Sequence, residues 1–202
     1  MLILKFIFAF LLLSFTQLSY SHDPIKFNTQ DVYLIANVLN PEYEGGDMYE
    51  VFELMPGIGI GTALTGIKLG YGQVFVEAGY NYLGTYHRDV YEGGTETNYY
   101  LYDNEETLQN IYANFKLSYP LSDNFLMNLK LGRGLFYTQV EATSRYERSK
   151  LYDIKEGSDL SNKSMVGFGL EYLSNEKFSY SFEYIEYGYY LRTWVGSFSF
   201  RL

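Results

Sequence analysis

The feature that most constrains the fold is an alternation of apolar and polar residues with a period of two. It is clearest in residues 192–202, where Trp194, Phe198, Phe200 and Leu202 share one face and small or polar residues occupy the other. Because successive side chains of a β-strand point to opposite faces, this period predicts a strand with one apolar face.

Five further segments show the same alternation. They are residues 73–84, 111–119, 124–134, 165–173 and 177–190. Weaker patterns cover residues 31–39 and 57–71, and the glycines of the second predict a bulge or bend. The chain therefore contains about eight strands, the smallest size of bacterial transmembrane barrels.

The connections between these strands differ in length. Short links rich in turn-forming residues lie at 70–72, 120–123 and 174–176. Long polar stretches, predicted as loops, cover 40–56, 85–106 and 140–163. Tight turns at one rim and long loops at the other are typical of an outer-membrane barrel, with turns in the periplasm and loops outside the cell.

The composition decides which face is buried. Hydrophobic residues make up 47% of the chain, with 23 Tyr and 15 Phe, and they dominate one face of the strands, while Gly, Ser and Asn dominate the other. An eight-stranded barrel has little interior room, so a soluble barrel with these rings inside would be overfilled. We therefore predict an all-β, eight-stranded antiparallel up-and-down barrel in the outer membrane of a Gram-negative bacterium, with its apolar face toward lipid.

The first 21 residues differ from the rest. Lys5 precedes an apolar run from Phe6 to Leu13, and Ser19, Tyr20 and Ser21 end the segment. This pattern predicts a signal peptide at 1–21, and residues 22–202 form the barrel domain. After it no apolar run approaches ~18 residues, which excludes membrane-spanning helices. A net charge of −9 argues against nucleic acid as a partner.

These features resemble a known family. The signal peptide, the GIGIG stretch at 57–61, the alternation of long loops with short turns and the aromatic C-terminal strand are similar to the OmpA/OmpX-type outer-membrane β-barrel domain, over residues 27–202. The resemblance implies an integral outer-membrane protein, and an aromatic C-terminal signal read by the barrel assembly machinery. Here the terminal residue is Leu202, and the signal residues are Trp194, Phe198, Phe200 and Leu202.

The polar face of the strands carries six charged residues. They are Glu77, Lys116, Lys130, Glu171, Glu183 and Arg201. Because an unpaired charge in a low-dielectric lumen is costly, we expect ion pairs between them. The expected pairs are Glu77 with Lys116, Lys130 with Glu171 and Glu183 with Arg201. The preferred interpretation is a network that fills and rigidifies the lumen, and the alternative is a gated ion path through exchanging salt bridges.

The sequence offers no convincing catalytic, cofactor or metal site. His22 and His87 are the only histidines, and no serine lies near His87 in the chain. The first long loop contains five acids, at 42, 44, 47, 50 and 53, but their spacing does not match an EF-hand, and a solvated acidic face explains them. A lipid-modifying enzyme is therefore the least favoured reading.

Exposed loops on a rigid scaffold are where binding usually occurs. We therefore expect a surface protein with a filled polar lumen, acting in surface structure, adhesion or the binding of a host or surface ligand through its loops. The second long loop mixes acids with Tyr, a residue favoured in recognition surfaces. Arg133 is expected to contact a lipopolysaccharide phosphate at the outer membrane surface. A small-solute, porin-like channel is the alternative function.

Overall fold

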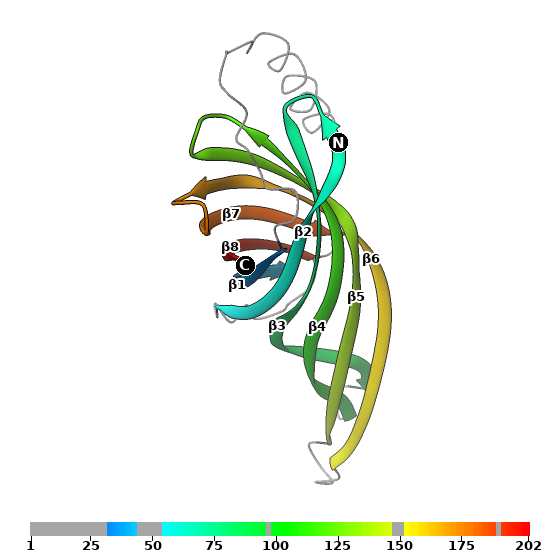
Figure 1. Ribbon diagram of the computed structural model, residues 1–202. Helices are drawn as coiled ribbons and strands as arrows, with labels where there is room; N and C mark the ends of the chain where they lie inside the picture. The colour runs from blue at the N-terminus through cyan, green and yellow to red at the C-terminus, as the bar shows by residue number, and fades with distance from the viewer. Residues whose placement is uncertain (1–31, 44–53, 96–97, 147–151, 189–190) are drawn as a thin grey trace.

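The structure is a computed structural model that describes residues 32–43, 54–95, 98–146, 152–188 and 191–202, with side chains left undescribed at 65, 66, 68, 87–104 and 142–156. Its elements are eight strands (Figure 1): β1 (Val32–Tyr43), β2 (Met55–Leu69), β3 (Gly72–Thr95), β4 (Asn98–Pro120), β5 (Phe125–Tyr146), β6 (Tyr152–Leu173), β7 (Phe178–Tyr187) and β8 (Leu191–Arg201). Among these residues no helix is long and apolar enough to cross a membrane.

The strands form one closed barrel. Each strand pairs with its neighbour in the sequence, and β1 closes the ring by pairing with β8, where Val38 lies opposite Gly196. Every pairing is antiparallel. The predicted eight-stranded, antiparallel, up-and-down barrel is therefore confirmed.

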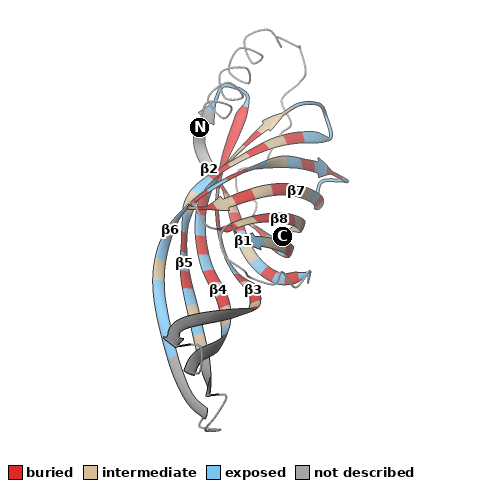
Figure 2. Ribbon diagram, turned by 180° about the vertical axis from the view of Figure 1, so that it is seen from behind, coloured by how far each residue is buried: buried red, intermediate tan, exposed pale blue. Residues whose placement is uncertain are grey.

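Burial alternates along the strands as the sequence predicted, and Figure 2 shows buried and exposed segments succeeding one another. In β4, Asn114 and Lys116 are buried in the lumen, whereas Ile111 and Phe115 point outward and are about 60% exposed, at 61% and 59%. The GIGIG stretch follows the same rule, because its glycines face the lumen and Ile58 and Ile60 face outward. The apolar face is therefore the outer wall.

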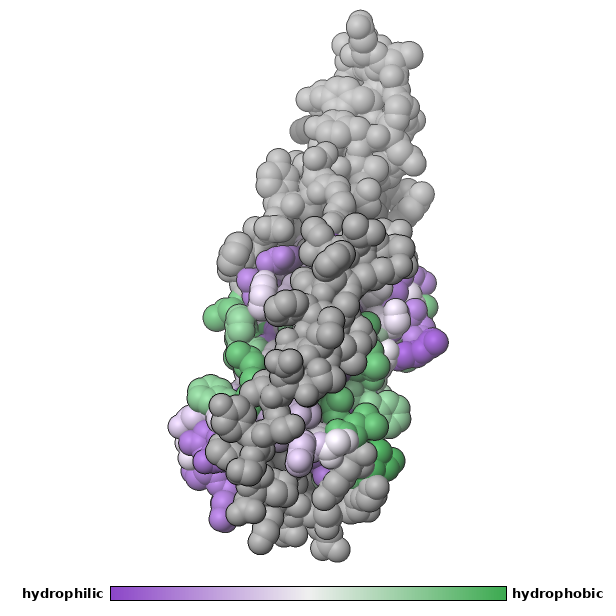
Figure 3. Space-filling model, turned by 90° about the horizontal axis from the view of Figure 1, so that it is seen from above, coloured by the Kyte–Doolittle hydropathy of each residue, from purple (hydrophilic) through white to green (hydrophobic). Residues whose placement is uncertain are grey.

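Outward apolar residues lie on all eight strands and are here called the apolar belt; hydrophobic side chains are visible along the flanks of the barrel in Figure 3. On β4 the belt extends from Ile111 to Tyr119, close to the 9–11 residues with which a tilted strand crosses the hydrocarbon of a bilayer. Outward polar side chains such as Arg133 and Ser164, which lie opposite each other on β5 and β6, interrupt the belt, and Leu135 and Leu160 are exposed beyond them toward the loop end.

Three irregularities interrupt the pairing of β3, and one of them lies between Glu92 and Thr95, at the end of the strand. Its register with β2 shifts between Ala63 and Lys68, which confirms the bulge or bend expected in the glycine-rich second strand. Its register with β4 shifts between Tyr82 and Gly84, so Leu83 is the extra residue of a bulge. Gly84 adopts φ +99° there, a conformation that favours glycine. Leu83 is fully buried in the barrel, and past the bulge Tyr86 is the next side chain of β3 that is buried there.

The two ends of the barrel are built differently. At the turn end, β2–β3, β4–β5 and β6–β7 are joined by short turns at 70–71, 121–124 and 174–177, as predicted. In the last of these the Asn175 side chain accepts hydrogen bonds from the backbone N–H of Lys177 and Phe178, at 2.8 and 3.0 Å. The opposite end, here called the loop end, carries the connections at 44–53, 96–97, 147–151 and 189–190.

The prediction of long loops at 85–106 and 140–163 is wrong. These stretches continue as paired strands: Glu92 of β3 lies opposite Tyr100 of β4, and Arg145 of β5 opposite Tyr152 of β6. These stretches were predicted as loops because their composition is polar. A sheet that is exposed to water on both faces can form without an apolar face, so a polar composition does not exclude strands. In Figure 1 the central strands extend far beyond β1, β7 and β8. The first expected loop, 40–56, is shorter than predicted, because β1 extends to Tyr43 and β2 begins at Met55. Residues 44–53 lie outside the described residues.

Candidate functional site

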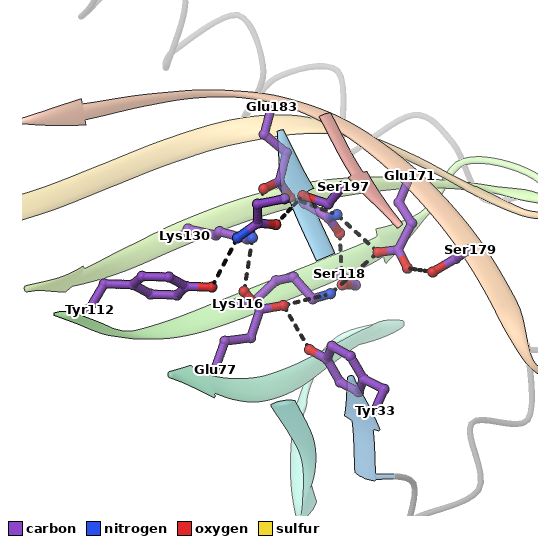
Figure 4. A network of polar contacts seen from close by, with 12 residues as sticks. Tyr33, Glu77, Tyr112, Lys116, Ser118, Lys130, Glu171, Ser179, Glu183 and Ser197 are labelled. Carbon is purple, nitrogen blue, oxygen red and sulfur yellow. Dashed lines mark hydrogen bonds and ion pairs between the residues drawn. The ribbon is translucent and has the colours of Figure 1, made fainter. Parts of the chain in front are cut away.

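Five buried charged side chains meet in the lumen, one from each strand from β3 to β7 (Figure 4). The Glu77 carboxylate lies 3.0 Å from Lys116 Nζ and 2.8 Å from Lys130 Nζ. Lys116 Nζ is also 3.4 Å from Glu171, and Lys130 Nζ is 2.6 Å from Glu183. The result is a chain of ion pairs with carboxylates and ammonium groups in alternation, here called the ionic network.

Only one of the three expected ion pairs is present. Glu77 contacts Lys116 as predicted, but the pairs Lys130 with Glu171 and Glu183 with Arg201 are wrong, because Lys130 contacts Glu77 and Glu183 instead. The physical reason is the narrow lumen: inward side chains reach across it, so adjacent strands do not fix the partners. Register also places Lys116 directly opposite Lys130. Glu77 therefore lies between two cations.

Arg201 occupies a different place from the other five charges. It is partly buried near the end of β8 and lines a small cavity at the turn end together with Glu171, Lys116 and Ser179. Sequence analysis placed it correctly on the inward face of β8 but assigned it the wrong partner.

Neutral polar side chains support the ionic network, and sequence analysis did not identify them. The Tyr33 hydroxyl donates to Glu77 at 2.7 Å, and the Ser179 hydroxyl donates to Glu171 at 2.6 Å. The Asn128 side-chain amide donates to Glu171 at 3.0 Å and to Glu183 at 3.3 Å. All three residues lie at inward positions of their strands, so the period of two was the signal that could have found them.

Aromatic rings also occupy the lumen, although sequence analysis assigned the large rings to the outside. Lys116 Nζ lies 4.9 Å from the centre of the Tyr33 ring and 5.0 Å from that of Phe75, so both rings contribute cation–π attraction. Room for them comes from glycine: a Cβ at Gly61 would lie 2.3 Å from the Tyr33 ring. Two glycines of the GIGIG stretch, Gly59 beside Tyr112 and Gly61 beside Tyr33, thus provide space for inward tyrosines.

Toward the loop end the lumen is filled by apolar side chains, here called the apolar plug. Its members are Leu39, Met55, Leu83, Tyr86, Leu108, Tyr112, Phe136, Met165, Ile185, Tyr187, Leu191 and Val195. The Phe136 and Tyr187 rings pack edge to face with centroids 5.1 Å apart. The prediction of a polar lumen is therefore correct for the part that holds the ionic network and wrong for the part toward the loop end. The error arose because most of these residues, such as Met55, Tyr86 and Phe136, were assigned to loops or not assigned to a face.

Toward the loop end, four strands continue past the residues that pair with β2 and β7, and Leu83, Tyr86 and Leu108 of the apolar plug lie at the base of this extension. The last residue of β3 to pair with β2 is Asn81, and the first of β6 to pair with β7 is Met165. The remaining parts are β3 82–95, β4 98–109, β5 137–146 and β6 152–164, here called the projecting sheet. Within the described residues its two outer edges, on β3 and β6, have no strand partner.

The structure adds no support for a catalytic or metal site. Among the described residues no group of three or more His, Asp or Glu side chains is placed to bind a metal ion. The backbone of His87 lies in the β3 part of the projecting sheet, and its side chain is not described. His22 lies outside the described residues.

The expected assembly residues Trp194, Phe198 and Phe200 lie on the outward face of β8, and Leu202 follows its last residue. The Trp194 ring stacks on Phe182 at 5.2 Å, and Phe198 stacks on Phe178 at 5.6 Å. Phe200 packs against Phe178 as well, at 5.2 Å, and Leu202 is 71% exposed. These residues join β7 and β8 through ring contacts, and their role as an assembly signal stays a prediction.

The fold and the lumen thus define a closed eight-stranded barrel with an apolar wall, an ionic network and an apolar plug. No protein-family model matches the chain, and no curated protein does. Several solved structures are similar to it. The Ail attachment invasion locus protein of Yersinia pestis aligns at 12% identity and TM-score 0.47, covering 86% of this chain and 97% of Ail.

Two further structures are similar to a comparable degree. Neisserial surface protein A aligns at 12% identity and TM-score 0.45, covering 87% of this chain and 97% of its own. A major outer membrane protein from Thermus thermophilus aligns at 14% identity and TM-score 0.47, covering 87% of this chain and all of its own. At these identities and TM-scores the likeness assigns neither an activity nor a ligand to this chain.

Proposed function

We propose that this chain is an integral outer-membrane protein whose barrel spans the bilayer. The closed ring supports this, because it satisfies the backbone hydrogen bonds that a membrane would leave unpaired at an open edge. The exposed apolar belt supports it too, since a soluble protein rarely exposes a contiguous apolar surface of this kind. We further propose that residues 1–21 direct export and that residues 22–202 form the barrel domain.

Replacing Leu131 with arginine is expected to lower the free energy of unfolding in phospholipid vesicles by about 2–4 kcal/mol, the cost of a cation on the lipid face near the bilayer midplane. Leu131 points outward from β5 and is 62% exposed. The matched control is Gln139→Arg, on the same face of the same strand but beyond the belt, which should change stability little. Equal stability of the two variants would show that Leu131 does not face lipid.

The proposed role is binding at the cell surface through the projecting sheet. The single observation that carries it is the extension of β3, β4, β5 and β6 past a lumen that is filled at the same level. A filled barrel supplies rigidity, and an exposed sheet on a rigid base supplies a surface for a host or surface ligand.

The test of this role is to shorten the projecting sheet without touching the barrel. One variant removes 88–104, which pair with each other at the tip of β3 and β4, and a second removes 143–155 from β5 and β6. Adhesion of cells expressing each variant is compared with adhesion of cells expressing the full chain. Loss of adhesion in a correctly inserted variant supports the role, and unchanged adhesion in both contradicts it.

Lipid contacts are a second part of the proposal. Arg133 is exposed on the outer wall opposite Ser164 of β6, on the loop-end side of Leu131. A guanidinium at that level suits a lipopolysaccharide phosphate, which it can contact with two parallel hydrogen bonds. Insertion by the barrel assembly machinery is proposed to depend on the outward residues of β8.

A small-solute channel is the alternative function. The ionic network supplies the charged groups that a gated path would use, but the apolar plug lies between that network and the loop end. In planar bilayers the refolded protein is expected to show no steady conductance. A stable, ohmic current from single inserted barrels would favour the channel over the closed barrel.

A further inference from the structure

A cavity of about 160 Å³ lies at the loop end of the lumen, next to the apolar plug. Buried plug residues form its apolar wall: Tyr86, Leu108, Phe136, Tyr187 and Leu191. The polar remainder of its lining is formed by Glu106, Thr138, Ser161 and Lys163. The cavity thus combines a buried apolar interior with polar groups, the composition of a site that accepts one apolar group and holds what is attached to it.

The apolar wall is held in place by the fold. The Tyr86 hydroxyl donates a hydrogen bond to the Leu83 carbonyl, in the β3 bulge. Tyr187 is fixed by its edge-to-face contact with Phe136 and is 1% exposed. A preformed wall needs no reorganisation when a ligand enters, which favours binding.

The free edge of β6 passes directly beside this cavity. The Ser164 carbonyl accepts a hydrogen bond from the Gly188 backbone N–H at 2.9 Å, so the backbone groups of Ser164 point away from β5. Because backbone groups alternate in direction along a strand, those of Asn162, Leu160 and Ser158 point the same way. Within the described residues no strand pairs with them there.

The side chains between these edge positions point inward. Ser161 and Lys163 both line the cavity. A strand added to the β6 edge would continue the line of β7, whose last inward side chain is Tyr187. Its own inward side chain opposite Ser161 would then point toward the cavity.

We propose that the β6 edge and the cavity form one site for an extended segment of a partner protein, with a single aromatic side chain of that segment in the cavity. This proposal rests on the surface-binding role above and names the class of ligand. Main-chain hydrogen bonds to the edge provide affinity, and the cavity provides specificity, as in other cases of β-strand addition.

The size of the cavity selects the aromatic side chain. An apolar cavity of about 150 Å³ in another protein holds one benzene molecule, so this one admits one ring and not two. Tyrosine suits it best, because its hydroxyl can reach the Thr138 and Ser161 hydroxyls while its ring contacts Phe136 and Leu108.

The test uses refolded full-length protein in micelles and a short synthetic peptide that alternates threonine and valine around a central tyrosine. Binding is followed by the NMR amide signals and hydrogen-exchange protection of Ser158, Leu160 and Asn162. Saturable shifts with new protection at these amides are expected. Replacing the peptide's tyrosine with alanine should weaken binding about tenfold to a hundredfold, the effect of burying one aromatic ring.

A pair of matched variants isolates the cavity. Ser161→Phe places a ring in the cavity, and Ser164→Phe makes the same change on the outer face of the same strand. S161F should remove the preference for the tyrosine peptide while S164F retains it. The proposal is overturned if the tyrosine peptide does not bind, or if the β6 edge pairs only with a second copy of this chain. It is also overturned if the tyrosine and alanine peptides show the same relative affinities for S161F as for the wild type. This experiment uses purified protein, whereas the surface-binding role is tested by adhesion of cells. Failure of the peptide to bind would therefore not contradict the surface-binding role.

Discussion

Replacing Glu77 with alanine is expected to lower the free energy of unfolding by about 3–5 kcal/mol, the cost of breaking a buried ion pair by removing one partner. Glu77 is 1% exposed and contacts both lysines of the ionic network, at 3.0 and 2.8 Å. Without it, Lys116 and Lys130 lie opposite each other with less compensation. Urea unfolding in vesicles can be followed by the fluorescence of Trp194, the single tryptophan.

Two comparisons sharpen this prediction. Glu141→Ala removes a carboxylate from an exposed position on β5 and should cost little. Lys116→Ala should cost less than Glu77→Ala, because Glu77 keeps Lys130 and the Tyr33 hydroxyl. If Glu77→Ala proves as mild as Glu141→Ala, the network is not buried as described.

Replacing Phe198 and Phe200 together with serine is expected to remove most of the protein from the outer membrane. The double change abolishes the ring contacts of Phe198 with Phe178 and Tyr180, and that of Phe200 with Phe178. At about 0.5–1.5 kcal/mol each, these contacts hold β8 against β7. We expect an additional loss of recognition by the assembly machinery, since both rings stand on the outward face of β8, the last strand of the barrel.

The two causes can be separated. A matched double variant, Phe115→Ser with Phe168→Ser, also removes two outward rings from the belt, but from β4 and β6. It should reach the outer membrane at a higher level than the β8 variant. Refolding of both variants into vesicles measures their stability without the machinery. If the two accumulate equally in cells, β8 carries no special signal.

The barrel wall was predictable from the sequence because lipid and lumen impose opposite demands on alternate residues. Phe178, Tyr180 and Phe182 were assigned to the outer face, and they are outward in the structure, whereas Glu183 and Ser179 are buried in the lumen. No comparable alternation is present at the described residues 157–160 of the projecting sheet, which are all exposed. Its strands were therefore mistaken for loops.

The residues of the ionic network could be predicted from the sequence, but the ion pairs that they form could not. Alternation alone places Glu77, Lys116, Lys130, Glu171 and Glu183 inside. Which ammonium meets which carboxylate depends on the height of each residue in the barrel and on reach across the lumen, neither of which a single strand reveals. The apolar plug was missed for a related reason, because inward Leu and Tyr near strand ends resemble lipid-facing residues in sequence.

The most direct test of the account uses the absence of cysteine from the chain. Ser158→Cys places one thiol at an exposed position on the projecting sheet, and Ser122→Cys places one in the exposed β4–β5 turn at the turn end. Intact cells are treated with a membrane-impermeant maleimide, and their outer membranes are then isolated. The account predicts that S158C is labelled on intact cells and that S122C is labelled only after permeabilisation. Equal labelling at both positions, or recovery of the protein in the inner membrane or the soluble fraction, would contradict it.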